Sequence, residues 1–337
     1  MDIVANMPAD DRAELFRNTG AQMDLEGALV EKDFWVCWTL SHLFAMESVR
    51  DVLIFKGGTA LSKVFRLIDR FSEDIDLVID YEPLGFVGDR DPRTDMSRTR
   101  RRKLLDEMMV SCRDYIAGPF LQALRDRCEA RLGDSETWSV ALSTENPNAI
   151  EFVYPQAGVV QMAYVRPRIL LELGTHAEFI PNGRYTITPF AAEQFPTVFG
   201  QASAPVNAIT AERTFWEKAT ILHAEHHRLP DSAFPGNHAR HYYDMAMLAR
   251  SPMCEVAVND IDLLRRVVEH KTKFYPSAWA RYDLAVPGTL MLVPPDKRIA
   301  ELQRDYAAMS VMIFGDSPRL DDLLATLADL EERINRE

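Results

Sequence analysis

The sequence predicts an α/β domain with a mixed sheet and N-terminal helices over residues 1–205, followed by a mostly helical domain over residues 206–337. Two observations predict this division. Short apolar runs typical of strands alternate with helical periodicity in the first part, whereas helical periodicity dominates the second. With 47% hydrophobic and 26% charged residues in a chain of 337, the composition is that of a protein that buries a sizeable core.

The first domain is expected to alternate helices and strands. The expected elements are helices over 25–46, 59–68 and 96–132, and strands over 52–55, 74–80, 138–144, 149–154, 168–173 and 185–188. The third helix is expected to be interrupted near Gly118 and Pro119, because proline cannot continue the hydrogen-bond ladder.

The second domain is expected to contain helices throughout. Apolar spacing predicts them over 211–227, 238–249, 261–274, 298–314 and 320–333.

The charge balance limits the partners of the protein. The chain has 51 acidic and 38 basic side chains, a formal net charge of −13. Diffuse binding to nucleic acid is therefore disfavoured, so a nucleic-acid partner requires a local basic patch. The four cysteines, at long spacings, are expected to be buried thiols. No apolar run is long enough for a membrane helix, and we expect a cytoplasmic protein without a membrane partner.

Asp74 and Asp76 are the sharpest local feature. Residues i and i+2 of a strand project to the same face, so the two carboxylates are expected side by side. Such a pair repels itself unless a cation neutralises it, which makes it a candidate site for Mg²⁺ or Mn²⁺ with a nucleoside triphosphate. A solvated strand edge is the alternative.

A glycine turn stands upstream of this pair. Lys56-Gly57-Gly58-Thr59-Ala60-Leu61-Ser62-Lys63 predicts a strand-to-helix turn whose backbone N–H groups can approach a phosphate. The spacing of a Walker A loop is absent. The alternative is a helix cap in which Thr59 satisfies backbone amides.

Together, the stretches Phe55–Lys63 and Arg70–Leu77 resemble the AbiEii/AbiGii (MenT-like) nucleotidyltransferase toxins of the DNA polymerase β-like superfamily. The resemblance spans roughly residues 25–335. It implies nucleotide-binding roles for Gly57, Gly58, Thr59, Ser62 and Lys63. One departure is that fifteen residues lie between Gly58 and Asp74, which suggests a helix extended by a turn.

The resemblance also implies a third carboxylate on a later strand. Glu172 stands in the apolar run Arg168–Leu173 and is the candidate third metal ligand. A carboxylate in such a run needs a partner or a metal. A salt bridge to Arg166 or Arg168 and a solvated strand end are the alternatives.

In the helical half, the stretches around Lys218 and Asp244 are similar to later motifs of the family, which places this pair at the catalytic centre. Lys218 would bring positive charge to the triphosphate, and Asp244 would hold that lysine or accept a hydrogen bond from the nucleotide. A surface ion pair is the alternative.

Two further features are candidates for regulation and for RNA contact. Ser72 precedes the acidic pair, and in some relatives a serine here is phosphorylated; a turn serine is the alternative. A basic run in an otherwise acidic chain is the candidate RNA-binding patch, although most charge runs are solvated faces. Its members are Arg98, Arg100, Arg101, Arg102 and Lys103.

By resemblance, the expected function is that of a toxin in a toxin–antitoxin or abortive-infection phage-defence system. It would add nucleotides from a nucleoside triphosphate to an RNA, with the 3′ end of tRNA as the implied acceptor and an antitoxin encoded nearby. Transfer to a protein hydroxyl is an alternative with the same metal site. A non-catalytic module that binds GTP or ATP and acts through a partner is the alternative from another class.

Overall fold

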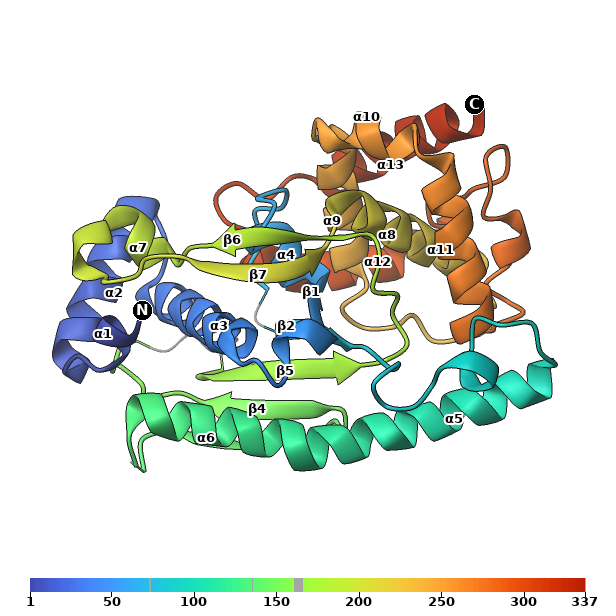
Figure 1. The fold of residues 1–337 in the computed structure, drawn as a ribbon. Coiled ribbons are helices and arrows are strands. Elements are labelled where there is room, and N and C mark those ends of the chain that lie inside the picture. The colour runs from blue at the N-terminus through green and yellow to red at the C-terminus, as the bar shows by residue number, and fades with distance from the viewer. Residues whose placement is uncertain (73, 135, 161–165, 337) are drawn as a thin grey trace. The chain divides into compact units, whose positions relative to one another are not determined.

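The computed structural model describes residues 1–72, 74–134, 136–160 and 166–336 (Figure 1). The chain divides into two compact units. The first is Met1–Val64 with Phe71–Ile209, and the second is Phe65–Arg70 with Thr210–Glu337. The division therefore falls at Ile209/Thr210 instead of after residue 205, and a short segment from the first half belongs to the second unit.

Within the described residues of the first unit, seven strands form one mixed sheet in the order β3-β4-β5-β2-β1-β7-β6. Strand β1 pairs antiparallel with β2 and parallel with β7, and β2 pairs parallel with β5. The predicted α/β fold with a mixed sheet is confirmed. The strands are β1 (Leu53–Lys56), β2 (Asp74–Ile79), β3 (Ser139–Leu142), β4 (Ala149–Val153), β5 (Arg168–Gly174), β6 (Asn182–Ile187) and β7 (Ala204–Ile209).

Strand β7 was not expected from the sequence. Its inward residues Ala204, Val206 and Ala208 are buried in the core, and Pro205 alternates with them on the exposed side. Two alanines and a proline carry little strand signal, because strands favour β-branched and aromatic residues. The strand exists because it pairs with both β1 and β6.

Helices cover the sheet of the first unit and share one apolar core with it. Apolar side chains from α3, α5 and α6 join those of the strands in this cluster, and Trp35 of α3 stacks on Tyr154 with ring centroids 5.4 Å apart. The helices are α1 (Asp2–Ala5), α2 (Ala9–Met23), α3 (Gly27–Ala45), α4 (Gly57–Lys63), α5 (Arg98–Tyr115), α6 (Leu121–Leu132) and α7 (Phe190–Gln194).

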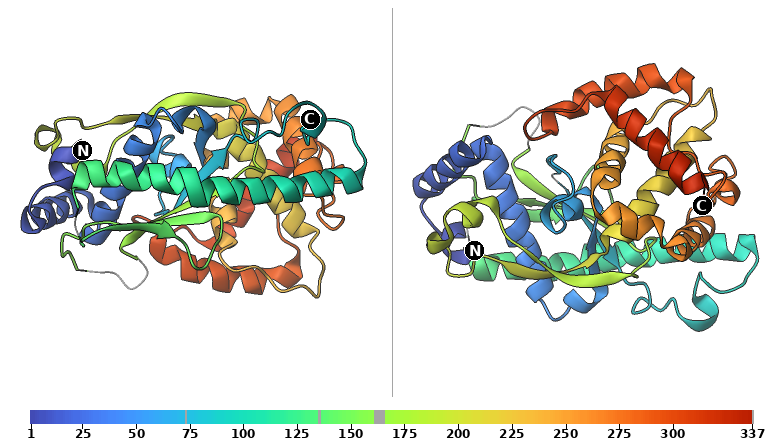
Figure 2. Two further views of the ribbon diagram at one scale, coloured as in Figure 1. Left: turned by 60° about the horizontal axis from the view of Figure 1, so that its bottom comes forward. Right: turned by 90° about the horizontal axis from the view of Figure 1, so that it is seen from above.

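Two helices differ from their predicted extents. The π-helical turn Ile116–Phe120 contains Pro119 and joins α5 to α6, so the expected interruption is absorbed in one long helix (Figures 1 and 2). Helix α4 ends at Lys63, short of residue 68, and Arg66 has a left-handed φ of 54°. The extra residues before Asp74 therefore do not extend the helix; Phe65–Arg70 joins the second unit instead.

The second unit is helical, as the sequence predicts. Helix α9 packs against α8, α12 and α13, and the segment before Asp74 is held by a hydrogen bond from the Phe314 amide to the Asp69 carbonyl at 2.7 Å. The helices are α8 (Ala211–His226), α9 (Ala239–Arg250), α10 (Met253–Val258), α11 (Ile261–Phe274), α12 (Asp296–Met309) and α13 (Leu320–Arg336).

Two simpler expectations can also be compared with the structure. All four cysteines are buried free thiols, as predicted. Among the described residues, no helix combines the length and the apolar character needed to cross a membrane.

Charged residues near the start of α3 are buried and hold the chain that follows β4. The Glu31 Oε1 atom accepts a hydrogen bond of 2.6 Å from the Ala157 amide, and Lys32 Nζ donates one of 2.9 Å to the Arg166 carbonyl. Arg12 of α2 donates to the carbonyls of Pro155 and Gln156. These contacts fix the path of the chain around residues 155–157 by side chains instead of by a strand ladder.

The buried Glu31 carboxyl is expected to make the protein less stable as the pH rises. Burial raises the pKa of Glu31 from 4.5 to about 7, opposed by the Ala157 amide and by Arg12. The unfolded chain ionises at the lower value, so stability is lost as pH rises from about 4.5 through about 7. Glu31→Gln is expected to gain up to about 3 kcal/mol relative to the natural chain across this window.

Urea denaturation at a series of pH values measures this difference. Glu14→Gln, at an exposed carboxylate of α2, is the matched control and is expected to show no comparable trend. A difference between Glu31→Gln and the natural chain that is the same at pH 5 and pH 8 would contradict the assignment.

Candidate active site

The turn between β1 and α4 lies directly against a carboxylate. Gly57 has a φ of +82°, and a Cβ at this position would stand 1.9 Å from Asp76 Oδ2 and 2.7 Å from its Cγ. Glycine is therefore required for two separate reasons: the left-handed backbone and the close approach of the carboxylate. The glycine turn and the acid-apolar-acid strand, which the sequence shows as separate motifs, form one site.

The strand register brings the charged side chains to one face of the sheet. Lys56 lies opposite Asp76 in the β1–β2 pair, and Asp76 lies beside Glu172 in the β2–β5 pair. Neighbours across a sheet share a face, and Asp74 shares it as the residue two positions before Asp76. The intervening Ile75 points to the other face and is fully buried in the core.

Thr59 anchors the start of α4 to the start of β2. Its side chain is buried at 1% exposure, and Oγ1 donates to the Asp74 carbonyl at 2.5 Å and lies 3.3 Å from the Ser72 carbonyl. The hydroxyl thus donates to backbone carbonyls at the start of β2 and holds that strand against α4. The N-cap of α4 is Lys56 and, among the described residues, no side chain caps the helix, so the alternative in which Thr59 satisfies backbone amides is wrong. Ser62, on the same helix, is half-buried, as is Ser72.

Lys63 has a structural partner in the core. Its Nζ atom lies 2.6 Å from Asp33 Oδ1 and 3.8 Å from the centroid of the Phe190 ring. Burial disfavours the charge, yet Asp33 holds the pKa of Lys63 above its usual value. The structure therefore places this lysine as the link between α4 and α3, which differs from the predicted contact with a nucleotide.

Glu172 is hydrogen-bonded but not ion-paired in the described residues. Its Oε1 atom accepts from Asn146 Nδ2 at 3.1 Å, whereas Arg166 and Arg168 pair with other glutamates. Within the part of the chain that the structure describes, no three His, Cys, Asp or Glu side chains converge closely enough to hold a metal ion by themselves. Glu172 as a third metal ligand stays a prediction.

The second unit contains a buried cluster of two cations around one carboxylate. Arg70 donates to both oxygens of Asp244, with Nε at 2.6 Å and an Nη atom at 2.8 Å, and Lys218 Nζ lies 2.7 Å from Asp244 Oδ2. Asp244 is 0% and Lys218 6% exposed, which excludes the surface ion pair considered for them.

Electrostatics within this cluster favour an ionised carboxylate and a less basic lysine. Burial raises the pKa of Asp244, but Arg70 and Lys218 together hold it well below its usual range. Burial lowers the pKa of Lys218, with Arg70 adding to the effect and Asp244 opposing it. Lys218 and Asp244 are thus brought together as the sequence predicts, with Asp244 holding the lysine.

Arg70 is the member of this cluster that sequence reasoning missed. It stands in the motif before β2, but its partner is 174 residues away along the chain. Its position directly before an acid-apolar-acid strand was the available signal. No local pattern could have identified Asp244 as its partner.

The basic run at the start of α5 divides into anchoring and exposed side chains. Arg100 donates to the Asp89 carbonyl, and Arg101 donates to the carbonyls of Pro92 and Thr94. The Nζ atom of Lys103 lies 3.9 Å from Oε1 of Glu107, one turn further along the helix. Arg98 and Arg102 are exposed, and among the described residues neither side chain makes a hydrogen bond or an ion pair.

A mixed sheet in which a glycine turn lies against an acid-apolar-acid strand defines a nucleotidyltransferase domain of the polymerase β type. Within this class the chain belongs to one family: residues 38–326 match the nucleotidyl transferase AbiEii toxin family of type IV toxin–antitoxin systems. The family implies a nucleoside triphosphate as substrate and an antitoxin as the second component, and nucleotidyltransferases of this kind generally use a divalent metal.

A solved structure supports the fold. The chain is similar to MenT4, a nucleotidyltransferase toxin from Mycobacterium tuberculosis H37Rv, with a TM-score of 0.53 and 14% sequence identity. The similarity covers 96% of this chain and 90% of that one. No curated protein matches the chain in sequence.

Gly57→Ala is expected to abolish nucleotidyl transfer and to destabilise the protein. The added Cβ forces the Asp76 carboxylate away and strains the backbone, which by itself costs about 1–2 kcal/mol. Gly85→Ala is a matched control, because Gly85 has a φ of +90° with open space around it. Gly85→Ala is expected to lose only the energy of backbone strain by urea denaturation and Gly57→Ala at least as much, but only Gly57→Ala should lose activity by tenfold or more. Equal activity in the two variants would contradict the contact with Asp76.

Arg70→Met is expected to lower the free energy of unfolding by about 3 kcal/mol, because it breaks a buried ion pair. Arg70→Lys should recover part of this loss, since it keeps the charge but not the two-point contact with Asp244. Urea denaturation of the two variants, with transfer activity measured alongside, checks this. If Arg70→Met were as stable as the natural chain, Arg70 would not hold Asp244.

Proposed function

We propose that this toxin adds nucleotides from a nucleoside triphosphate to the 3′ end of a tRNA, which blocks aminoacylation and growth. The observation that carries the proposal is the Asp76 carboxylate lying against the Gly57 turn, with Asp74 on the same face of the sheet. This arrangement puts paired metal-binding oxygens beside backbone that a phosphate can approach.

The residues present fit a divalent metal held jointly with the substrate. Mg²⁺ is usually bound by one or two carboxylates while substrate phosphates and water complete its shell. Asp74 and Asp76 supply that set of oxygens, and Glu172 lies one strand away in register with Asp76. When bound, Mg²⁺ or Mn²⁺ would neutralise the triphosphate and favour in-line attack by a hydroxyl at the α-phosphorus.

The chain's own residues contribute positioning and charge. The proposal assigns the backbone of Gly57 and Gly58 to the phosphates, and Thr59 fixes the strand that carries Asp74. The proposal assigns Lys218 to the charge that develops as pyrophosphate leaves, and Asp244 and Arg70 to holding that lysine. Its support is that Lys218 is buried next to a carboxylate shared by two cations.

Transfer of labelled nucleotide tests the proposal. The purified protein is incubated with Mg²⁺, total RNA and each α-labelled nucleoside triphosphate in turn, and the labelled product is sized. We expect a tRNA-sized product, at least a thousandfold less of it with Asp74→Ala or Asp76→Ala, and relief of toxicity in cells by the same changes.

Other outcomes separate the alternatives. Label on protein in place of RNA would support transfer to a protein hydroxyl. No transfer at all, with full toxicity of Asp74→Ala/Asp76→Ala, would contradict catalysis and favour a nucleotide-binding module. Asp80→Ala is a control for loss of a carboxylate near the end of the same strand, and is expected to keep activity.

The exposed part of the basic run is proposed as the contact with the RNA backbone. Arg98→Gln/Arg102→Gln is expected to weaken tRNA binding and to reduce the slope of log affinity against log salt by about 1–2. Arg17→Gln/Arg266→Gln removes the same charge from exposed arginines elsewhere and should leave the slope unchanged. Binding measured by filter retention over a salt series checks this, and equal slopes in both double variants would contradict the assignment.

Ser72 as a phosphorylation site stays a prediction. Its side chain is half-buried next to the strand of the acidic pair, where a phosphate would add like charge beside Asp74.

A further inference from the structure

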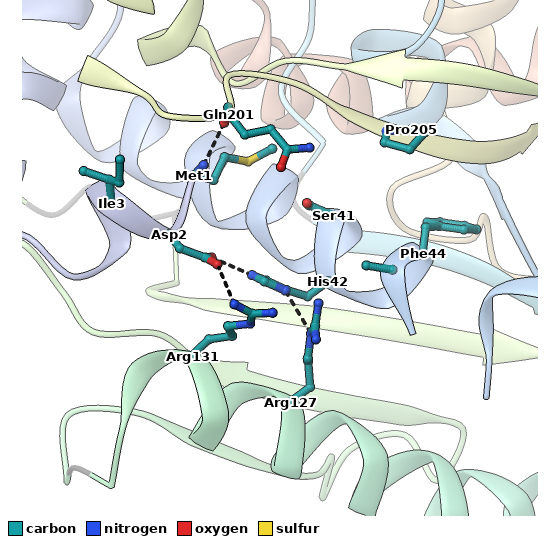
Figure 3. A pocket seen from close by; sticks show the side chains of 11 residues that line it. Met1, Asp2, Ile3, Ser41, His42, Phe44, Arg127, Arg131, Gln201 and Pro205 are labelled. Atoms are coloured by element: carbon teal, nitrogen blue, oxygen red, sulfur yellow. Dashed lines mark hydrogen bonds and ion pairs between the residues drawn. The ribbon is translucent and has the colours of Figure 1, made fainter. Parts of the chain in front are cut away.

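A cavity of about 400 Å³ in the first unit shares no residue with the face that carries Asp74 and Asp76 (Figure 3). It is formed by the start of α1, the C-terminal part of α3, one face of α6 and the chain entering β7. Small-molecule sites commonly have volumes of about 300–1,000 Å³ and a few convergent polar groups. The lining residues are Met1, Asp2, Ile3, Ser41, His42, Phe44, Ala45, Arg127, Arg131, Gln201 and Pro205.

The one carboxylate among the residues that line this cavity has three partners, all from the protein itself. Asp2 Oδ1 accepts from Trp38 Nε1 at 2.9 Å and lies 2.7 Å from His42 Nε2, and Oδ2 lies 3.5 Å from an Nη atom of Arg131. Asp2 therefore positions the ring and neutralises a single charge.

The hydrogen bonds of the His42 ring, which lies between Asp2 and Arg127, indicate that the imidazole is neutral. Its Nδ1 atom accepts from Arg127 Nε at 3.1 Å, so the ring proton lies on Nε2 and is donated to Asp2. Burial lowers the pKa of His42, which agrees with a neutral ring. Both ring nitrogens are thus satisfied, and His42 fixes the position of the Arg127 side chain.

Two guanidinium groups against one carboxylate leave a positive surplus at the cavity. Arg127 and Arg131 are one helical turn apart on α6 and both line it. Among the described residues, Arg127 makes one side-chain hydrogen bond, to the neutral imidazole, and no ion pair. Its two Nη groups therefore keep their donors. Burial and the charge of Arg131 lower the pKa of Arg127, and the charge of Asp2 opposes them without reversing the shift.

We propose that this cavity binds a phosphate group, either free phosphate or the phosphate of a small organic ester. A guanidinium donates two parallel hydrogen bonds to phosphate oxygens, and the Nη groups of Arg127 are placed to supply them beside Arg131. Phe44 and Pro205 give the cavity an apolar wall that an ester's organic part can contact. The site would act as a sensor or an anchor separate from the acidic pair.

Calorimetric titration of the full-length protein, made without an N-terminal tag, tests this site. The probes are inorganic phosphate, ribose 5-phosphate and ribose, in buffer with EDTA so that metal-dependent binding at the acidic pair does not contribute. We expect saturable binding of one phosphate per chain with a Kd below about 1 mM, and no binding of ribose.

Variants locate the binding. Arg127→Gln is expected to weaken it at least tenfold. Ala45→Glu is a second variant at an exposed lining position, which places a competing carboxylate at the cavity while leaving the ionic network intact, and it should have the same effect. Arg17→Gln removes one exposed charge outside the cavity and should bind phosphate as the natural chain does.

Tighter binding of ribose 5-phosphate than of phosphate would assign the site to an ester, and equal binding would assign it to free phosphate; either supports the proposal. Absence of saturation up to about 10 mM, or unchanged binding in both Arg127→Gln and Ala45→Glu, would overturn it. Melting temperatures of the variants show that each is folded, and transfer activity is measured separately because it depends on the other face of the sheet.

Discussion

The contact between the Gly57 backbone and the Asp76 carboxylate is the constraint on which the candidate active site depends. It exists because β1 and β2 pair antiparallel with Lys56 opposite Asp76, so the turn that follows β1 must pass the side chain of β2. Glycine permits that passage. Thr59 then fastens the helix start to the strand start, which makes turn and carboxylate a single rigid element.

Much of this arrangement could be predicted from local sequence, and the reason is that its parts are local. The acid-apolar-acid alternation, the glycine pair and most helices depend on residues close in the chain, so periodicity and motif spacing reveal them. The registers of Asp76 with Lys56 and with Glu172 follow from strand pairing, which the sequence suggests only through the order of elements.

What sequence reasoning missed depends on distant partners. Lys63 looked like a phosphate ligand because of its place in the motif, but a buried Asp33 from another helix is its partner. Arg70 had no assigned role because Asp244 is far along the chain. Strand β7 lacked a β-forming composition and is stabilised by the strands on either side. In each case a tertiary contact overrides the local signal.

The path of the chain before Asp74 has a consequence for dissecting the protein. Because Phe65–Arg70 belongs with Thr210–Glu337, the second unit is discontinuous in sequence. A C-terminal fragment cut at residue 210 would lack the arginine that pairs with Asp244 and the backbone partner of Phe314. To express the second unit alone with all of its residues, Phe65–Arg70 would have to be joined to Thr210–Glu337 through a linker. A protein split into two separately encoded chains would need its break at another position.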